Sequence, residues 1–230
     1  MKNSYHYLLF DLDGTLTESA PGILNSVRYT LAHYQIPEES VLPLERFIGP
    51  PLMESFMNFL GLPEEEAKRA VYIYREYFAE KGIFENAPYE GIPEVLQRLV
   101  SAGLTLGVAT SKPEHFARRI LEHYDLEQYF QVICGALDEG PNGTKPAVMR
   151  RAIREMEEKF SASKDEMIMI GDREHDIFGA KETGIASMGV LYGYGDREEL
   201  EKTGADVICE TVWDMCRNLL GDSLVNSIRP

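Results

Sequence analysis

The chain has 230 residues, 44% of them hydrophobic, which is enough to bury the core of one domain or of one domain with an insertion. Its 38 acidic and 23 basic residues give a formal net charge of −15, which argues against nucleic acid or an anionic membrane as the main partner. An anionic substrate would be repelled at long range. Any phosphate site must therefore be built locally, from a cation, a lysine and backbone N–H groups.

The cysteines and the apolar runs bear on the cellular compartment. Cys134, Cys209 and Cys216 are an odd number and form no C-x-x-C motif, so we interpret them as small apolar core residues in a reduced cytosol. We recognise no leader segment and no apolar run of membrane-spanning length. The sequence therefore predicts a soluble, cytoplasmic protein.

The first half of the chain begins with a strand and continues with helices. The apolar run at residues 8–10 predicts a short buried strand. Apolar residues at three- and four-residue spacing, with stops at proline or glycine, then predict helices at 20–34, 52–60 and 64–81, and a short one before Gly49. This helical block predicts an inserted cap domain over residues 18–87, with a core domain formed by residues 1–17 and 88–230.

In the second half, strands and helices alternate. The predicted strands cover residues 104–110, 132–134, 166–172 and 185–190, with an edge strand at 205–208. The predicted helices cover residues 91–102, 113–123, 144–159, 176–183 and 211–220. Alternation of this kind predicts an α/β fold with a Rossmann-like parallel sheet and helices on both faces.

Polar residues follow several of the predicted strands. They are Asp11 and Asp13 after the first strand, Thr110, Ser111 and Lys112 after the second, and Asp172 and Asp176 after the run at 166–171, with Lys145 opening a helix. Ligands of open α/β sheets bind beyond the carboxyl ends of the strands, so we expect these side chains to converge there. Carboxylates beside hydroxyl groups and a lysine predict a Mg²⁺ and phosphate site.

Each part of this pattern also has a plain structural interpretation. Thr110 and Ser111 could cap a helix that begins at Pro113. Asp172 could belong to a simple turn, and Lys145 taken alone could be a solvated surface residue. The pattern of the whole chain favours the site over these alternatives.

The four groups of polar residues, in this order, resemble the motifs of the haloacid dehalogenase-like superfamily. The motifs are Asp11-x-Asp13-x-Thr15, Thr110-Ser111, Lys145 and Gly171-Asp172-x-x-x-Asp176. The helical block between the first two motifs resembles the C1-type cap of that superfamily, and the chain is similar to its phosphoglycolate phosphatase-like branch. In this family a loop like the one around Gly49 faces the active site.

The resemblance implies a role for each motif residue. The catalytic residues would be Asp11, Asp13, Thr110 and Lys145. The phosphate would be bound by Gly14, Thr15, Thr110, Ser111, Lys145 and Gly49. The metal would be bound by Asp11, Asp13 through its backbone carbonyl, Asp172, and Asp176 directly or through water.

These roles imply a Mg²⁺-dependent phosphatase that acts through an aspartyl phosphate. Asp11 would attack phosphorus, and Asp13 would protonate the leaving oxygen and later deprotonate water. We expect a small phosphorylated metabolite as substrate, such as phosphoglycolate, a nucleoside monophosphate, pyrophosphate or a sugar phosphate. We expect no nucleic-acid or membrane partner, and a monomer or homodimer. The alternatives are a phosphomutase similar to the β-phosphoglucomutases and a catalytically silent regulatory protein.

Overall fold

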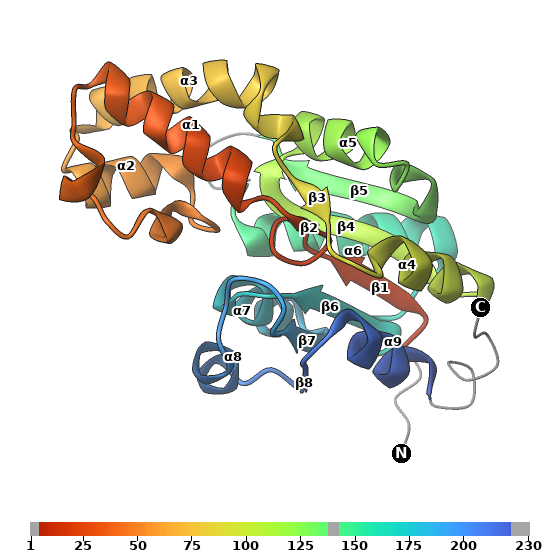
Figure 1. Ribbon diagram of the computed structural model, residues 1–230. Helices are drawn as coiled ribbons and strands as arrows, with labels where there is room; N and C mark the ends of the chain where they lie inside the picture. The colour runs from red at the N-terminus through yellow and green to blue at the C-terminus, as the bar shows by residue number, and fades with distance from the viewer. Residues whose placement is uncertain (1–4, 138–142, 222–230) are drawn as a thin grey trace. The chain divides into compact units, whose positions relative to one another are not determined.

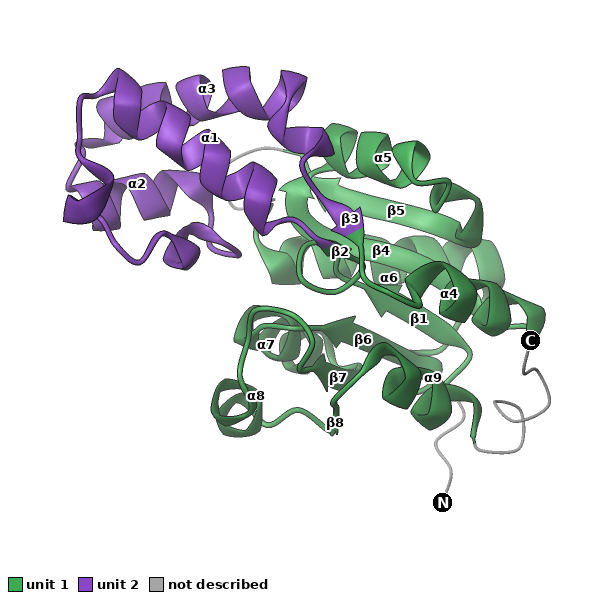
Figure 2. Cartoon of the chain, viewed as in Figure 1, with its two compact units in different colours: residues 1–17, 88–230 green, residues 18–87 purple. Residues whose placement is uncertain are grey.

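The computed structural model describes residues 5–137 and 143–221. The chain divides into two compact units, which Figure 2 shows in different colours. Unit 1 comprises Met1–Thr17 and Pro88–Pro230, and unit 2 comprises Glu18–Ala87. Two short strands, β2 (Thr17–Glu18) and β3 (Ala87–Pro88), pair with each other where the chain passes between the units.

Unit 1 is built on a parallel sheet of six strands in the order β5-β4-β1-β6-β7-β8 (Figure 1). The strands are β1 (Tyr7–Phe10), β4 (Thr105–Pro113), β5 (Phe130–Ala136), β6 (Met167–Gly171), β7 (Ala186–Val190) and β8 (Val207–Cys209). Every pair of neighbouring strands in this sheet is parallel. The predicted α/β fold with a parallel sheet is confirmed.

The helices of unit 1 connect successive strands and cover the sheet. They are α4 (Ile92–Ser101), α5 (Glu114–His123), α6 (Lys145–Phe160), α7 (Glu174–Thr183), α8 (Arg197–Thr203) and α9 (Val212–Leu220). Helix α6 packs against β4, β5 and α7, whereas α4 packs against α9. Figure 1 shows α4 in front of the sheet and α6 behind it, so both faces are covered.

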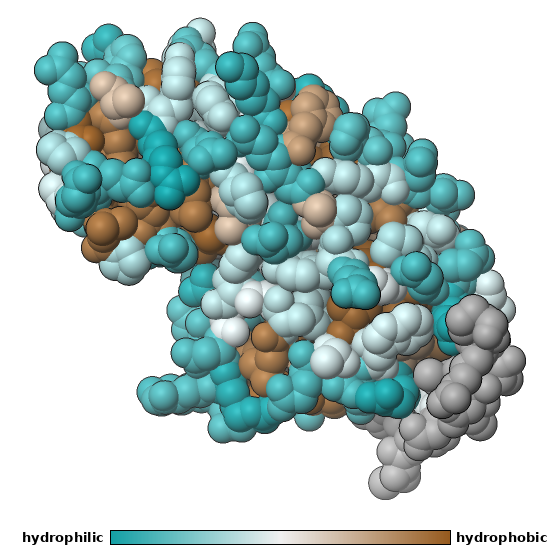
Figure 3. Space-filling view, in the orientation of Figure 1, coloured by the Kyte–Doolittle hydropathy of each residue, from teal (hydrophilic) through white to brown (hydrophobic). Residues whose placement is uncertain are grey.

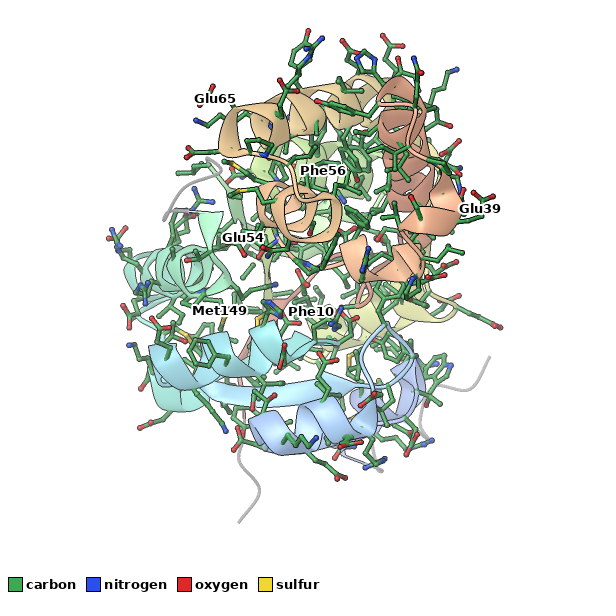
Figure 4. The ribbon with its side chains drawn as sticks, turned by 90° about the vertical axis from the view of Figure 1, so that its left-hand side faces the viewer. Phe10, Glu39, Glu54, Phe56, Glu65 and Met149 are labelled. Atoms are coloured by element: carbon green, nitrogen blue, oxygen red, sulfur yellow. The ribbon has the colours of Figure 1, made fainter. Side chains whose placement is uncertain are left out.

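The central strands are apolar because they are buried on both faces. In β1, Leu8, Leu9 and Phe10 are each fully buried. Leu9 joins one core cluster with Met149 of α6, while its two neighbours point to the opposite face. Figure 4 labels Met149 beside the sheet. A charged residue that follows such a strand directly is therefore held at the edge of a rigid core.

Unit 2 is helical, as predicted for the block between β1 and β4. Its α-helices are α1 (Ala20–His33), α2 (Leu52–Leu60) and α3 (Glu64–Glu80). Helices α1 and α2 each pack against α3. Phe56 lies inside the unit, with its ring 5.6 Å from that of Phe47 and 6.5 Å from that of Tyr74. Figure 4 shows Glu39 and Glu65 pointing outward from the same unit.

Two helices of unit 1 differ from the prediction. Helix α8 was not expected, although Asp196 caps it by accepting a hydrogen bond from the Glu199 N–H at 2.8 Å, and Gly204 ends it. Helix α7 begins at Glu174 rather than at Asp176, because the Asp176 carboxylate accepts the Arg173 N–H at 3.1 Å within its first turn.

The surface agrees with the composition. Hydrophilic residues cover most of the face shown in Figure 3. Among the described residues, no helix combines the length and the apolar character that crossing a membrane requires.

Candidate active site

The carboxyl edge of the three central strands carries most of the predicted site residues. Phe10 of β1 is in register with Val108 of β4 and with Ile170 of β6. Asp11 follows Phe10 directly, and Asp172 comes two residues after Ile170. The parallel register therefore places these acids side by side at one edge of the sheet.

Three carboxylates from this edge form one cluster. Asp11, Asp172 and Asp176 each offer an oxygen, and these oxygens lie within 4.8 Å of one another. Asp172 and Asp176 are almost completely buried. Asp172 is therefore more than a turn residue, because a simple turn gives no reason to bury its charge beside two others.

Lys145 is the cation of this cluster. Its Nζ atom lies 2.8 Å from Asp11 Oδ1 and 2.7 Å from Asp176 Oδ1, and it donates a hydrogen bond to the Ala109 carbonyl at 3.1 Å. Only 6% of the residue is exposed, so the alternative of a solvated surface lysine is wrong. The lysine lies at the first turn of α6, and its side chain reaches Asp11, directly after β1, and Ala109 within β4.

The charges of the cluster do not balance, because three carboxylates share one ammonium group. Burial raises the pKa of Asp172 to about 8, and the charges of Asp176 and Asp11 contribute to this rise. Burial also raises the pKa of Asp11, against the opposing effect of Lys145. Burial alone would lower the pKa of Lys145, but Asp11 and Asp176 outweigh it and the pKa is raised.

The donor set of the cluster fits a divalent cation such as Mg²⁺. All three side chains offer carboxylate oxygens, which hard cations prefer. Asp11 Oδ1 and Asp176 Oδ1 are buried and, although close to Lys145, make no correctly directed hydrogen bond. A bound divalent cation would satisfy these oxygens and offset the excess negative charge.

Asp172 is held from two sides. The Thr15 hydroxyl donates to its Oδ1 at 3.1 Å, and the Tyr194 N–H donates to its Oδ2 at 2.8 Å. Gly14 passes so close that a Cβ there would lie 2.2 Å from Asp172 Oδ2, and its φ is +83°. Both facts require glycine at this position. The predicted phosphate contacts of Gly14 and Thr15 stay predictions.

The second acid of the first motif has a lysine of its own. Lys112 Nζ contacts both carboxylate oxygens of Asp13, at 2.9 and 2.7 Å. The Asp13 side chain thus lies outside the cluster of three carboxylates. Sequence reasoning placed Lys112 at the end of a strand but gave it no role. The sequence signal that could have pointed to this role was the position of Lys112, a cation directly after the hydroxyl pair Thr110-Ser111 at the end of a strand.

The hydroxyl pair lies on β4 and not at the start of a helix. Helix α5 begins at Glu114 and has Pro113 before it, so the alternative of a Thr110-Ser111 helix cap is wrong. Thr110 is buried, and its hydroxyl interacts with the Asp11 carboxylate. Ser111 is half-buried beside it. Their phosphate-binding roles stay predictions.

The remaining predicted residue, Gly49, belongs to unit 2. It is exposed and has a φ of +101°, as a loop glycine before two prolines permits. Its predicted contact with phosphate stays a prediction.

Comparison with known proteins finds a matching family model and several similar proteins. A family model described as haloacid dehalogenase-like hydrolase matches residues 8–190. The 5'-nucleotidase of Pseudomonas aeruginosa is 44% identical over 196 residues, which cover 85% of this chain and 87% of that protein. The tyrosine-protein kinase PtkA of Mycobacterium tuberculosis is 38% identical over 215 residues, 93% of this chain and 72% of its own.

A relative of lower identity and a solved structure are also similar to this chain. The phosphoglycolate phosphatase of Vibrio parahaemolyticus is 29% identical, over 90% of this chain and 93% of its own. The crystal structure of a predicted phosphatase from Clostridium acetobutylicum superposes with a TM-score of 0.87 and 45% identity, covering 94% of this chain and 98% of that one.

Proposed function

The chain belongs to the haloacid dehalogenase-like hydrolase family, in its phosphoglycolate phosphatase-like branch, and we propose that it is a Mg²⁺-dependent phosphatase of small phosphorylated metabolites. The observation that carries the proposal is the convergence of Asp11, Asp172, Asp176 and Lys145 at the carboxyl edge of the sheet. This constellation suits the transfer of an anionic phosphoryl group to a carboxylate.

Asp11 is the nucleophile of the proposed reaction. One of its carboxylate oxygens forms a bond to phosphorus as the bond from phosphorus to the leaving oxygen breaks, giving an aspartyl phosphate. Lys145, 2.8 Å from Asp11, reduces the repulsion between the two anions and holds the carboxylate in line. The Thr110 hydroxyl, which interacts with the same carboxylate, offers a donor beside the attack position.

Asp13 moves the protons. As the leaving oxygen departs, Asp13 donates its proton to it. Asp13 then accepts a proton from a water whose oxygen bonds to phosphorus as the bond from phosphorus to the Asp11 oxygen breaks. Inorganic phosphate is released, and both aspartates return to their starting states. An acid at this position favours phosphate esters over organic halides, because a halide leaves without a proton.

Asp11, Asp172 and Asp176 would hold the divalent cation, together with the Asp13 backbone carbonyl. When bound, Mg²⁺ would neutralise charge on the phosphoryl oxygens and orient them. Asp176 completes the site either directly or through a water, and Lys145 fixes its carboxylate at 2.7 Å.

Among the candidate substrates, we place a nucleoside 5'-monophosphate first. The relative named 5'-nucleotidase is 44% identical to this chain, whereas the relative named phosphoglycolate phosphatase is 29% identical. Phosphoglycolate, pyrophosphate and sugar phosphates follow. A phosphomutase would form the same aspartyl phosphate but return the phosphoryl group to a sugar, and a kinase would pass it to another acceptor.

A substrate panel tests the proposal. The purified chain with Mg²⁺ should release phosphate from several phosphomonoesters, with the highest kcat/KM for a nucleoside 5'-monophosphate. Asp11→Asn should abolish release while the unfolding midpoint stays close to that of the wild type. Isomerisation of a sugar phosphate without release would indicate the mutase, and no turnover even of p-nitrophenyl phosphate would indicate the silent regulatory protein.

A further inference from the structure

The loop at residues 192–195 follows β7 and leads to α8 (Figure 1). It packs against the Asp172 carboxylate of the candidate site. Its sequence is Tyr-Gly-Tyr-Gly. The backbone N–H of Tyr194 donates a hydrogen bond to Asp172 Oδ2 at 2.8 Å. The loop therefore contacts the side chain that we propose as a metal ligand.

The two glycines of the loop pack directly on Asp172. A Cβ on Gly193 would lie 2.4 Å from Asp172 Cβ and 2.2 Å from the Gly14 carbonyl oxygen, and one on Gly195 would lie 1.9 Å from the Asp172 carbonyl oxygen. Neither loop glycine has a positive φ, in contrast to Gly14. Close approach of the backbone, and not conformation, is therefore what requires glycine at both positions.

Tyr192 ties this loop to the turn that follows the first motif. Its hydroxyl donates to the Thr15 carbonyl at 3.1 Å, and the Thr15 hydroxyl in turn donates to Asp172 Oδ1 at 3.1 Å. The Tyr192 ring packs edge-on against Tyr89 at 5.1 Å. Each carboxylate oxygen of Asp172 thus accepts a hydrogen bond from a different segment, one that contains Thr15 and one that contains Tyr194. The Tyr192 hydroxyl joins these two segments.

We infer that the loop at residues 192–195 is a positioning element for the metal ligand Asp172, an inference that rests on the proposed metal site. Hydrogen bonds from Thr15 and Tyr194 fix the rotation of the carboxylate and leave its remaining lone pairs for the cation. Outer groups that orient a ligand in this way typically change metal affinity about 10- to 100-fold when they are removed. Tyr192 acts on Asp172 indirectly, because it makes no hydrogen bond to the carboxylate itself but holds the two donating segments together.

The test measures Mg²⁺ binding to the full chain by calorimetry, without substrate. Tyr192→Phe removes only the hydroxyl, and we expect it to raise the Kd for Mg²⁺ by about tenfold, the lower end of that range. Tyr7→Phe is the matched control, because the Tyr7 hydroxyl also donates to a backbone carbonyl, that of Phe160 at 3.4 Å. Gly193→Ala should weaken Mg²⁺ binding more strongly, because its Cβ displaces Asp172.

The outcomes separate this inference from the proposed site. The Tyr192 hydroxyl also lies 3.8 Å from Met215 Sδ, whereas the hydrogen bond of Tyr7 is exposed, so without Mg²⁺ the unfolding midpoint of Tyr192→Phe should fall at least as far as that of Tyr7→Phe. If the wild type binds Mg²⁺ and Asp172→Asn does not, while Tyr192→Phe and Gly193→Ala bind it as tightly as Tyr7→Phe, the positioning role is wrong and the metal site stands. If the wild type binds no Mg²⁺, the metal site itself fails.

Discussion

At the scale of single residues, two lysines contact different aspartates of the candidate site. Lys145 contacts Asp11 and Asp176, which belong to the carboxylate cluster, and Lys112 contacts Asp13, which does not. The proposed nucleophile Asp11 and the proposed proton carrier Asp13, two residues apart in the chain, thus lie in different electrostatic surroundings. This separation suits two carboxylates that must do different chemistry.

Replacing Lys112 tests whether it positions Asp13. Lys112→Met should lower kcat by about tenfold, a part of the 10²- to 10⁴-fold that general acid–base catalysis typically contributes. The loss should be larger for an alkyl phosphate than for p-nitrophenyl phosphate, whose leaving group needs no proton. Lys112→Arg keeps the charge and should recover part of the activity. Equal losses on both substrates would indicate that Lys112 acts elsewhere in the reaction.

Gly14 combines a positive φ with close approach to Asp172, and a second glycine allows the two effects to be separated. Gly103 has a φ of +85°, almost the same as the +83° of Gly14, but among the described residues no atom beyond its two chain neighbours lies within 4 Å of the position that a Cβ would occupy there. Each alanine variant should lose about 1–2 kcal/mol of unfolding free energy for the backbone conformation alone. Gly14→Ala should also lose the stabilisation that added Mg²⁺ gives.

Chemical denaturation with and without Mg²⁺ checks this expectation. Gly103→Ala should respond to Mg²⁺ as the wild type does. If the two variants lose equal stability and keep equal responses to Mg²⁺, the contact between Gly14 and Asp172 has no role in metal binding.

At the scale of elements, the sequence predicted strands best where an apolar run is buried on both faces. The runs that form β1 and β6 are unambiguous, and acids follow both, so the position of Asp11 and Asp172 at one edge could be expected from topology alone. The position of Lys112 could not. Pro113 suggested the start of a helix, whereas β4 continues to Pro113 through a register shift and carries Lys112 toward Asp13.

The loop at residues 192–195 marks a second limit of sequence reasoning. Glycines after a strand fit a plain turn as well as a site, and the pattern Tyr-Gly-Tyr-Gly does not reveal what the backbone approaches. Only the folded chain shows that Gly193 and Gly195 pack on Asp172, a residue that lies about twenty positions earlier in the sequence, after another strand. Helix α8 could have been predicted from the sequence, because Asp196 and Gly204 are common start and stop signals of a helix.

At the scale of the whole molecule, composition and alternation of elements were sufficient to predict an α/β core interrupted by a helical block. They gave no information on which aspartates would contact a lysine and which would not, because these contacts depend on packing between strands that are distant in sequence. The net charge of −15 makes the two buried lysines more important, since they supply local positive charge in an acidic protein.

The interpretation of the cysteines as core residues makes a prediction for the whole fold. All three are buried, and burial raises the pKa of Cys134 to about 12, that of Cys209 to about 11, and that of Cys216 as well. A raised pKa lowers the thiolate fraction at pH 8, and the thiolate is the reactive form. The native protein should therefore not react with Ellman's reagent at pH 8, and the unfolded protein should react at three thiols. A thiol that reacts rapidly in the native protein would contradict the interpretation.

The central claim, that Asp11 becomes phosphorylated, is tested most directly by trapping the intermediate. Asp13→Asn keeps the nucleophile but removes the group that activates water, so with Mg²⁺ and p-nitrophenyl phosphate the aspartyl phosphate should accumulate. Acid quenching and peptide mass spectrometry should then find one phosphoryl group on the peptide that contains Asp11, and none when Asp11→Asn is added. A phosphoryl group on another residue, or rapid phosphate release with no phosphoryl group on the protein, would contradict the account.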